Sequence, residues 1–299
     1  GQLGCSGSTY TFNGNGHTIT ITASTAKNFK GLFDILNGTV KNLNVNVNSN
    51  VTLKDFCGWI DTTHYDYYCH KGIPNVCTIT NCTSNGAITG NGCKFGSGGI
   101  AGAYVGYGKC WRTGSALIRN CTTYGDIGTL SDGDDYDYGC GGIVGAFAGV
   151  SGSYYNDGKC EIQNCKSYGK IGGYSGGIAG NDAGNHGQIE VVDCASVGEI
   201  IGYEAGGIVG VYAGGNRGKC NIINCTSSGD INGGNDSFDT AQTGGIVGAY
   251  SGSDGSDGGK CFIINCSSSG QINGASSGGI AGQSAGNNGQ CEIINCSSS

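Results

Sequence analysis

Residues 206–231 read Gly206-Gly-Ile-Val-Gly-Val-Tyr212, then Lys219-Cys-Asn-Ile-Ile-Asn-Cys225, and close on Gly229-Asp-Ile231. Each of these apolar blocks is separated from the next by Gly, Ser or Asn, which are typical of turns. None of the blocks has the period of a helix, and each is short enough for a strand of about 4–6 residues. The segment therefore predicts three short strands joined by tight turns.

The same blocks recur along most of the chain. The Gly-Gly-Ile block ends at Ile100, Ile143, Ile178, Ile208, Ile246 and Ile280. The last cysteine of the second block recurs at spacings of 39, 44, 29, 31, 41 and 30 residues. The shortest spacings indicate a repeat of about 30 residues with insertions in its loops.

A repeat of three strands cannot bury its apolar side chains alone, so successive repeats must stack. We therefore expect an all-β fold, a parallel β-helix solenoid of about 30-residue, three-strand coils stacked about 4.8 Å apart. The crossover rule favours a right-handed winding. A β-propeller blade needs four strands in about 40–45 residues and does not fit the short spacings.

We expect one continuous solenoid domain along the chain. Residues 1–53 form its initial coils, residues 54–76 form an insertion loop rich in Cys and aromatic side chains, and residues 77–299 form the repetitive coils. The insertion holds Pro74, the single proline of the chain, which fits a segment outside the hydrogen-bonded ladders.

The composition excludes several other classes of protein. The 299 residues include 62 Gly but 1 Pro, which excludes collagen, and only 12% are charged, which argues against a coiled coil. An apolar content of 37% argues against disorder. A net charge of -7 with 15 Lys and Arg argues against nucleic acid as a partner. No apolar run reaches the roughly 18 residues of a membrane span.

Alternation along the second block predicts which side chains face inward. Cys160 and Ile162 point to the core and Glu161 points outward. The phase must slip once at the Asn of the block, which a left-handed conformation allows. We expect two structural ladders, in which stacked Asn side chains bond one another. Their members are Asn81, Asn120, Asn164, Asp193, Asn224, Asn265 and Asn295, and Cys82, Cys121, Cys165, Cys194, Cys225, Cys266 and Cys296.

The chain contains 18 cysteines, for which a disulfide framework is the first hypothesis. However, the first position of the block holds Cys77, Ala116, Cys160, Ile189, Cys220, Cys261 and Cys291. Exchange with Ala and Ile, and the poor disulfide geometry of stacked residues, predict reduced core thiols in the ladders. Disulfide candidates are the irregularly placed cysteines Cys5, Cys57, Cys69, Cys93, Cys110 and Cys140.

Metal sites have weaker support in the sequence. Zinc at His64, Cys69, His70 and Cys77 is an alternative to a loop disulfide, but adjacent Cys and His do not match structural zinc spacing. Ca²⁺ could bind the acidic cluster of Asp132, Asp134, Asp135 and Asp137, which lacks the Gly and Glu of an EF-hand and is otherwise a solvated loop. We expect no resident metal and no cofactor.

Parallel β-helices often carry polysaccharide lyases and hydrolases, which need convergent carboxylates on an outer face. The outward strand positions offer no such set, so we expect no catalytic residues and a non-enzymatic protein. Glycosylation candidates are Asn37, Asn50 and Asn235 in expected turns or loops. The ladder residues Asn81, Asn120, Asn224, Asn265 and Asn295 also match the acceptor triplet, but we expect the ladder to hide them.

The pattern Gly-Gly-Ile-Val-Gly-x-Tyr-x-Gly followed by Lys-Cys-x-Ile-x-Asn-Cys-x-Ser-x-Gly-x-Ile, as at 206–231 and 244–272, resembles the GLUG-like β-helix repeats of microbial surface proteins. Its cysteine-bearing form resembles repeat proteins encoded by giant DNA viruses of amoebae. The resemblance covers most of residues 8–53 and 77–299. It implies surface, adhesion or particle-shell components without catalytic residues.

These observations predict a structural protein that assembles head to tail, as a filament or layer, on a virus particle or an extracellular surface. The chain stops at Ser299 directly after a second block, and residues 1–21 could complete the last coil of another copy. The partner is then the chain itself. The alternative is an adhesin whose loops bind a glycan or receptor through exposed aromatic side chains. Those would be Trp59, Tyr65, Tyr67, Tyr68, Tyr154 and Tyr155.

Overall fold

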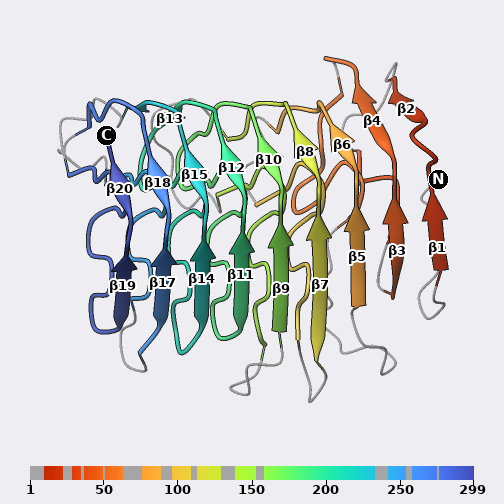
Figure 1. The fold of residues 1–299 in the computed structure, drawn as a ribbon. Helices are drawn as coiled ribbons and strands as arrows, with labels where there is room; N and C mark the ends of the chain where they lie inside the picture. Colours follow the sequence, from red (N-terminus) through yellow and green to blue (C-terminus); the bar gives the residue numbers. More distant parts are fainter. Residues whose placement is uncertain are drawn as a thin grey trace.

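The computed structural model of the chain describes residues 10–22, 29–34, 37–49, 51–62, 76–88, 96–108, 113–128, 139–152, 158–232, 242–253, 258–274 and 276–299. Within these ranges the chain consists of strands, bridges and turns, and it forms two long parallel sheets (Figure 1). None of the described residues belongs to a helix of the length and hydropathy needed to cross a membrane. The expected all-β class with parallel sheets is confirmed.

The first sheet contains the second sequence block of every repeat. Its strands, in spatial order, are β1 (Tyr10–Asn13), β3 (Asn37–Lys41), β5 (Val76–Thr80), β7 (Gly114–Arg119), β9 (Gly158–Gln163), β11 (Gln188–Val192), β14 (Lys219–Ile223), β17 (Lys260–Ile264) and β19 (Gln290–Ile294). Spatial order follows sequence order, so each strand pairs only with the equivalent strand of the neighbouring repeats. This is the arrangement of a solenoid.

The second sheet follows the first after a short bend in each repeat. Its strands are β2 (Thr18–Ile21), β4 (Asn44–Val47), β6 (Thr83–Ser84), β8 (Thr122–Thr123), β10 (Lys166–Ser167), β12 (Ala195–Ser196), β15 (Thr226–Ser227), β18 (Ser267–Ser268) and β20 (Ser297–Ser298). A small third sheet pairs β13 (Ile200–Ile201) with β16 (Ile231–Asn232). We call the segment from one strand of the first sheet to the next a layer.

The sharp bend between the two long sheets is made by the Asn ladder. Asn164, Asp193 and Asn224 have φ angles of 51°, 54° and 55°, the left-handed conformation expected from the sequence. On either side of Asn224 the inward residues are Cys220 and Ile222, then Cys225 and Ser227, all buried. The predicted phase slip is therefore confirmed.

Glycine in the Gly-Gly-Ile block permits the layers to close on their core. A Cβ built on Gly177 would lie 2.2 Å from both the carbonyl oxygen of Gly207 and Oγ of Ser196. Because one of these two neighbours is backbone of the next layer, no side chain can be accommodated without moving that layer. The row of glycines in this block therefore allows the block to lie close to the second sheet.

The insertion expected at residues 54–76 is wrong at its start. Gly58 and Asp61 pair with Gly98 and Ala101 of the next layer, so residues 54–62 lie in the solenoid. Trp59 takes the position that Gly99 holds in the next layer, and this replacement disguised a Gly-Gly-Ile block in the sequence. The remainder of the expected insertion, 63–75, lies outside the described residues.

Candidate functional site: an acidic interruption of an aromatic corner

One corner of the solenoid is lined by residues in the left-handed conformation. Each lies three positions after the residue that forms the last bridge of the Gly-Gly-Ile block. The column contains Tyr104, Phe147, Asp182, Tyr212, Tyr250 and Ser284, with φ angles of 61°, 59°, 53°, 58°, 55° and 59°. Neighbouring layers are joined by the same bond at each step, as where the Phe147 N–H donates to the Asn181 carbonyl at 3.0 Å. We call this set the corner column.

Aromatic rings stack in two pairs along the corner column, which holds Asp182 between the pairs and Ser284 in the last layer. The rings of Tyr104 and Phe147 are 4.7 Å apart and 9° from parallel. Those of Tyr212 and Tyr250 are 5.1 Å apart and 16° from parallel. Asp182 lies between these two pairs, because its N–H donates to the Val211 carbonyl of the Tyr212 layer at 2.9 Å. A carboxylate thus replaces a ring in the middle of the stack.

Two carboxamides lie against the carboxylate of Asp182. Asn181 donates from Nδ2 to Oδ2 at 3.0 Å, and Asn185 donates from Nδ2 to Oδ1 at 2.7 Å. The Oδ1 atoms of both Asn side chains are buried and have no hydrogen-bond partner among the described residues. Buried acceptors without a donor are uncommon in folded proteins and costly to maintain.

A second acidic group, Glu204, belongs to the neighbouring layer. Burial raises the pKa of Asp182 to about 6, although the bond from Asn185 partly opposes the shift. Burial also raises the pKa of Glu204. The pKa of Tyr212 is raised by burial and then by the charges of Glu204, Tyr250, Asp182 and Tyr174. The ion pairs found in the described ranges do not involve either carboxylate.

This arrangement is rich in acceptors and poor in cations. Carboxylates with raised pKa values can act as acids or bases in catalysis, but such a function also requires a reactive geometry between them. No hydrogen bond joins Asp182 to Glu204 in the described part of the chain. The chemistry that the corner supports best is therefore recognition of a positively charged donor.

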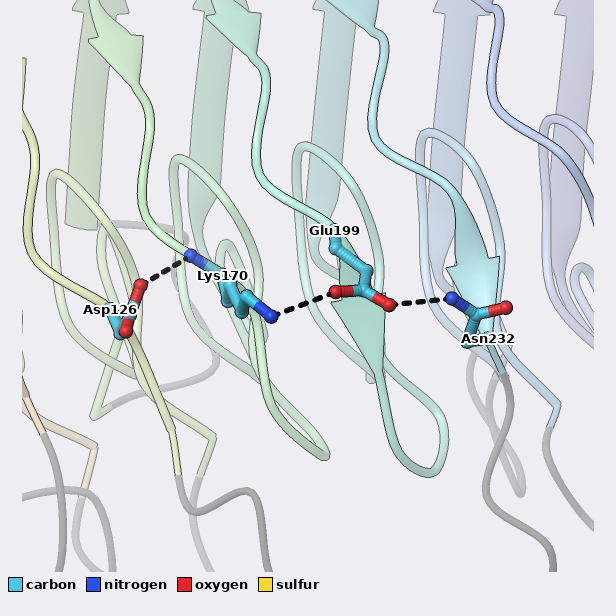
Figure 2. A network of polar contacts seen from close by, with 4 residues as sticks. All are labelled: Asp126, Lys170, Glu199 and Asn232. Carbon is cyan, nitrogen blue, oxygen red and sulfur yellow. Dashed lines mark hydrogen bonds and ion pairs between the residues drawn. The ribbon is translucent and has the colours of Figure 1, made fainter.

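A different polar row follows the third side of the solenoid. Figure 2 shows Asp126, Lys170, Glu199 and Asn232 in consecutive layers. The Lys170 N–H donates to Asp126 at 2.9 Å, Lys170 Nζ lies 3.1 Å from Glu199 Oε2, and Asn232 donates to Glu199 at 2.6 Å. Each of these contacts joins neighbouring layers, and about half of the Lys170 side chain is exposed. We assign it a structural role.

The Asn ladder forms hydrogen bonds from layer to layer. Asn81 donates to Asn42 at 2.9 Å, Asn120 to Asn81 at 3.0 Å and Asn164 to Asn120 at 2.8 Å. Beyond Asp193, the bond from Asn265 to Asn224 measures 3.3 Å. The ladder also extends to Asn42 and Asn13, joined at 2.9 Å, which the sequence analysis missed because those layers have no cysteine block. The expectation that the ladder hides its acceptor triplets is wrong, since Asn81, Asn120, Asn224, Asn265 and Asn295 are exposed.

The cysteines of both ladders carry free thiols. Those of the second ladder accept hydrogen bonds from backbone. The N–H of Cys165 donates to Sγ of Cys194 at 3.4 Å, and the Cys121 N–H does the same to Cys165. This role explains why each repeat from Cys82 to Cys296 keeps a cysteine there, whereas the first ladder alternates with Ala and Ile. Burial raises the pKa of the Cys160 thiol, which keeps it protonated.

Several expected site residues lie outside the described residues. These are the disulfide candidates Cys5, Cys69, Cys93 and Cys110, the Ca²⁺ candidates Asp132, Asp134, Asp135 and Asp137, the glycosylation candidates Asn50 and Asn235, and the zinc candidates His64, Cys69 and His70. Within the described ranges no three His, Cys, Asp or Glu side chains gather at a metal-binding distance.

Three other expectations change. Cys57 and Cys140 were chosen because their positions had no packing role, yet both are buried in the core. Asn37 begins strand β3 opposite Val76 and does not lie in a turn.

Trp59 was expected as an exposed contact residue and is fully buried, with its indole N–H donating to the Gly86 carbonyl at 2.9 Å. The expected contact residues Tyr65, Tyr67, Tyr68, Tyr154 and Tyr155 lie outside the described residues.

Sequence reasoning did not identify the acidic corner. Its signal was present as a departure from the repeat, since the position before the corner column holds Ala103, Ala146, Val211 and Ala249 but Asn181 in the middle layer and Gln283 in the last. No family model, curated protein or solved structure matches this chain. The site must therefore be interpreted from its own chemistry.

Proposed function

We propose that the protein is a non-enzymatic structural solenoid that assembles head to tail into a filament or layer. The proposal includes a right-handed winding and coils of about 30 residues, which the crossover rule and the shortest repeat spacings favour. The resemblance to GLUG-like repeats and to the cysteine-bearing repeats of giant DNA viruses supports a place on a virion or an extracellular surface.

The observation that carries this proposal is the register between layers: each strand of the first sheet pairs only with the equivalent strand of a neighbouring layer, so layers of two copies can pair in the same way. Ile293 in β19 is 49% exposed, although the equivalent Ile263 and Ile222 of the preceding layers are fully buried. Ile272 is also exposed, at 42%, although the equivalent Ile231 is fully buried. A layer with this apolar inner face can pair with another layer of the same pattern, whichever chain supplies it.

The first layer of a second copy has the complementary features. Tyr10 and Phe12 in β1 occupy the same columns of the sheet as Cys291 and Ile293, and both are only partly buried. The Asn ladder has the same direction at both ends, because each Nδ2 donates to the layer before it. Asn13 of the next copy would donate to Asn295, so the ladder continues across the junction.

Electron microscopy and light scattering of the purified chain test the proposal. We expect concentration-dependent filaments or layers without any ligand, and we expect Ile293→Lys to abolish them by placing a charge in the junction. Val197→Lys is the matched control, since Val197 is similarly exposed but lies on a side wall, and it should assemble normally. A chain that stays monomeric, or an Ile293→Lys variant that still assembles, would refute this function.

A surface adhesin remains the second candidate because of one exposed aromatic pair. Tyr124 and Tyr168 stack at 5.2 Å and 9°, and they are 56% and 43% exposed. Exposed aromatic side chains of this kind bind sugars and partner surfaces. A monomeric chain that binds a glycan array, with binding lost in the Tyr124→Ser and Tyr168→Ser double variant, would favour the adhesin over assembly.

A further inference from the structure

The repeat itself provides an internal standard for the corner. At the second and third positions after the last bridge of the block, the layers hold Ala103 and Tyr104, Ala146 and Phe147, Val211 and Tyr212, and Ala249 and Tyr250, while the last layer holds Gln283 and Ser284. The layer between the second and third of these holds Asn181 and Asp182. Ala103, Ala146, Val211 and Ala249 are buried, and Asn181 is only 5% exposed, so a carboxamide replaces a small apolar side chain at a core position.

These replacements have no compensating partner in the described part of the chain. The carboxylate of Asp182 receives two amide hydrogen bonds but no cation. The same two amides leave Oδ1 of Asn181 and Oδ1 of Asn185 buried without donors. A partly buried carboxylate and two buried carbonyl oxygens are unfavourable unless something supplies both positive charge and N–H groups. Polar groups that depart from a fold's own pattern in this way are characteristic of binding sites.

The surroundings indicate the chemical class of that missing group. Phe147 and Tyr212 flank Asp182 in the corner column, one layer to each side. Aromatic rings beside carboxylates attract organic cations through cation–π and ionic interactions. A hard metal ion fits less well, because it requires six or more oxygen ligands, and both amides here present nitrogen to the carboxylate.

We propose that the Asp182 corner binds a small organic cation with several N–H donors, an alkylammonium or a guanidinium. Asp182 supplies the counter-charge, the carbonyl oxygens of Asn181 and Asn185 accept N–H groups, and Tyr212 covers the site. This function is independent of assembly, because the corner lies in the middle layers of the solenoid.

The test uses the full chain and titration calorimetry with tyrosine fluorescence as a second signal. The probes are methylguanidinium and n-butylammonium, with tetramethylammonium as a cation without donors and CaCl₂ as a metal ion. We expect the first two to bind with a dissociation constant on the order of 1 mM or tighter. Tetramethylammonium should bind at least about tenfold more weakly, which corresponds to the loss of the N–H donors.

The decisive variant restores the repeat pattern with Asn181→Ala and Asp182→Tyr together. Because other layers use these residues, the variant is expected to fold, and circular dichroism and thermal unfolding verify this. It should bind the donor cations at least about tenfold more weakly. Asp230→Asn is the matched control, since it removes one carboxylate from another corner, where Asp230 accepts from the Gln271 N–H, and it should bind as the parent does.

Three results would overturn the proposal. One is the absence of binding by either donor cation. Another is equal binding by the folded repeat-pattern variant, which would place the cation elsewhere on this acidic protein. The third is binding of Ca²⁺ at this corner in preference to the organic cations, which would make it a metal site.

Discussion

Asn224 donates a hydrogen bond from Nδ2 to Oδ1 of Asp193, 3.1 Å away, and this bond is where the amide ladder changes character. Asn42, Asn81, Asn120 and Asn224 each both donate and accept a ladder bond. An ionised Asp accepts only, so Oδ1 of Asn164 cannot receive a bond from Asp193. The ladder is interrupted between Asn164 and Asp193, because Asp193 has a carboxylate oxygen where Asn would have the donating amide nitrogen.

Replacing Asp193 by Asn should therefore restore the ladder. We expect Asp193→Asn to raise the free energy of unfolding by about 0.5–1 kcal/mol, the net value of one hydrogen bond. Urea unfolding followed by circular dichroism measures the change. Asp193→Ala, which removes the acceptor for Asn224, should instead lower it, and a stabilised Ala variant would contradict the interpretation.

The two cysteine ladders should respond differently to alanine. Cys194→Ala removes the acceptor of the buried Cys165 N–H as well as the sulfur volume, so we expect a loss of about 2–3 kcal/mol. Cys160→Ala places in β9 the residue that β7 already has at this position, Ala116, and should cost only about 1 kcal/mol. Urea unfolding of both variants provides the comparison. Equal losses would mean that the sulfur acceptor contributes nothing.

A column of buried hydroxyls in the second sheet offers a test in the opposite direction. The Oγ atoms of Ser167, Ser196 and Ser227 are buried and have no hydrogen-bond partner in the described ranges. We expect Ser196→Ala to leave stability unchanged or raise it by up to about 1 kcal/mol, because an unsatisfied polar atom is removed.

Ser175→Ala is the matched control for this prediction. Ser175 is also buried, but its Oγ donates to the Gly173 carbonyl at 3.0 Å and accepts from the Cys140 N–H at 3.1 Å. We expect a loss of about 1–3 kcal/mol in its thermal or urea unfolding. If Ser196→Ala is as destabilised as Ser175→Ala, the Ser196 hydroxyl has a partner that the structure does not describe.

The acidic corner makes stability depend on pH. Burial raises the pKa of Asp182 from 3.8 to about 6, so the folded chain binds a proton more tightly than the unfolded chain. The free energy of unfolding should therefore fall as pH rises from about 4 to about 6, by on the order of 2 kcal/mol, and then level off. The raised pKa of Glu204 acts in the same direction.

Asp182→Asn isolates this contribution, because Asn does not titrate. The difference in unfolding free energy between parent and variant, measured by urea unfolding at a series of pH values, should change across that interval and be constant above it. Parallel pH profiles would show that Asp182 titrates normally in the folded chain.

The sequence was sufficient to predict the layers because the same alternation of inward and outward residues and the same Asn bend recur in many repeats. The inward parity of Cys220 and Ile222 and the left-handed bend at Asn224 follow from period two and from the conformational freedom of Asn, and both are observed. Trp59 escaped the same reasoning because a large ring replaced a Gly at one copy of the pattern. A single copy carries too little periodicity to reveal its phase.

The acidic corner was beyond this reasoning for a different physical reason. Asp182 and Glu204 lie 22 positions apart and belong to turns, where sequence periodicity gives no face. Their proximity to Tyr212 depends on how two layers superimpose, and the raised pKa values depend on burial by those layers. Only the comparison of turns within the chain, Ala146 and Phe147 against Asn181 and Asp182, could have drawn attention to it.

The amide ladder also gives the solenoid a direction. All its carboxamide dipoles point the same way, with the nitrogen of each Asn facing the layer before it, so one end of the column presents donors and the other presents acceptors. A fibre built by repeating this column would be polar, with two chemically distinct ends. Subunits would then add at unequal rates to the two ends of the fibre.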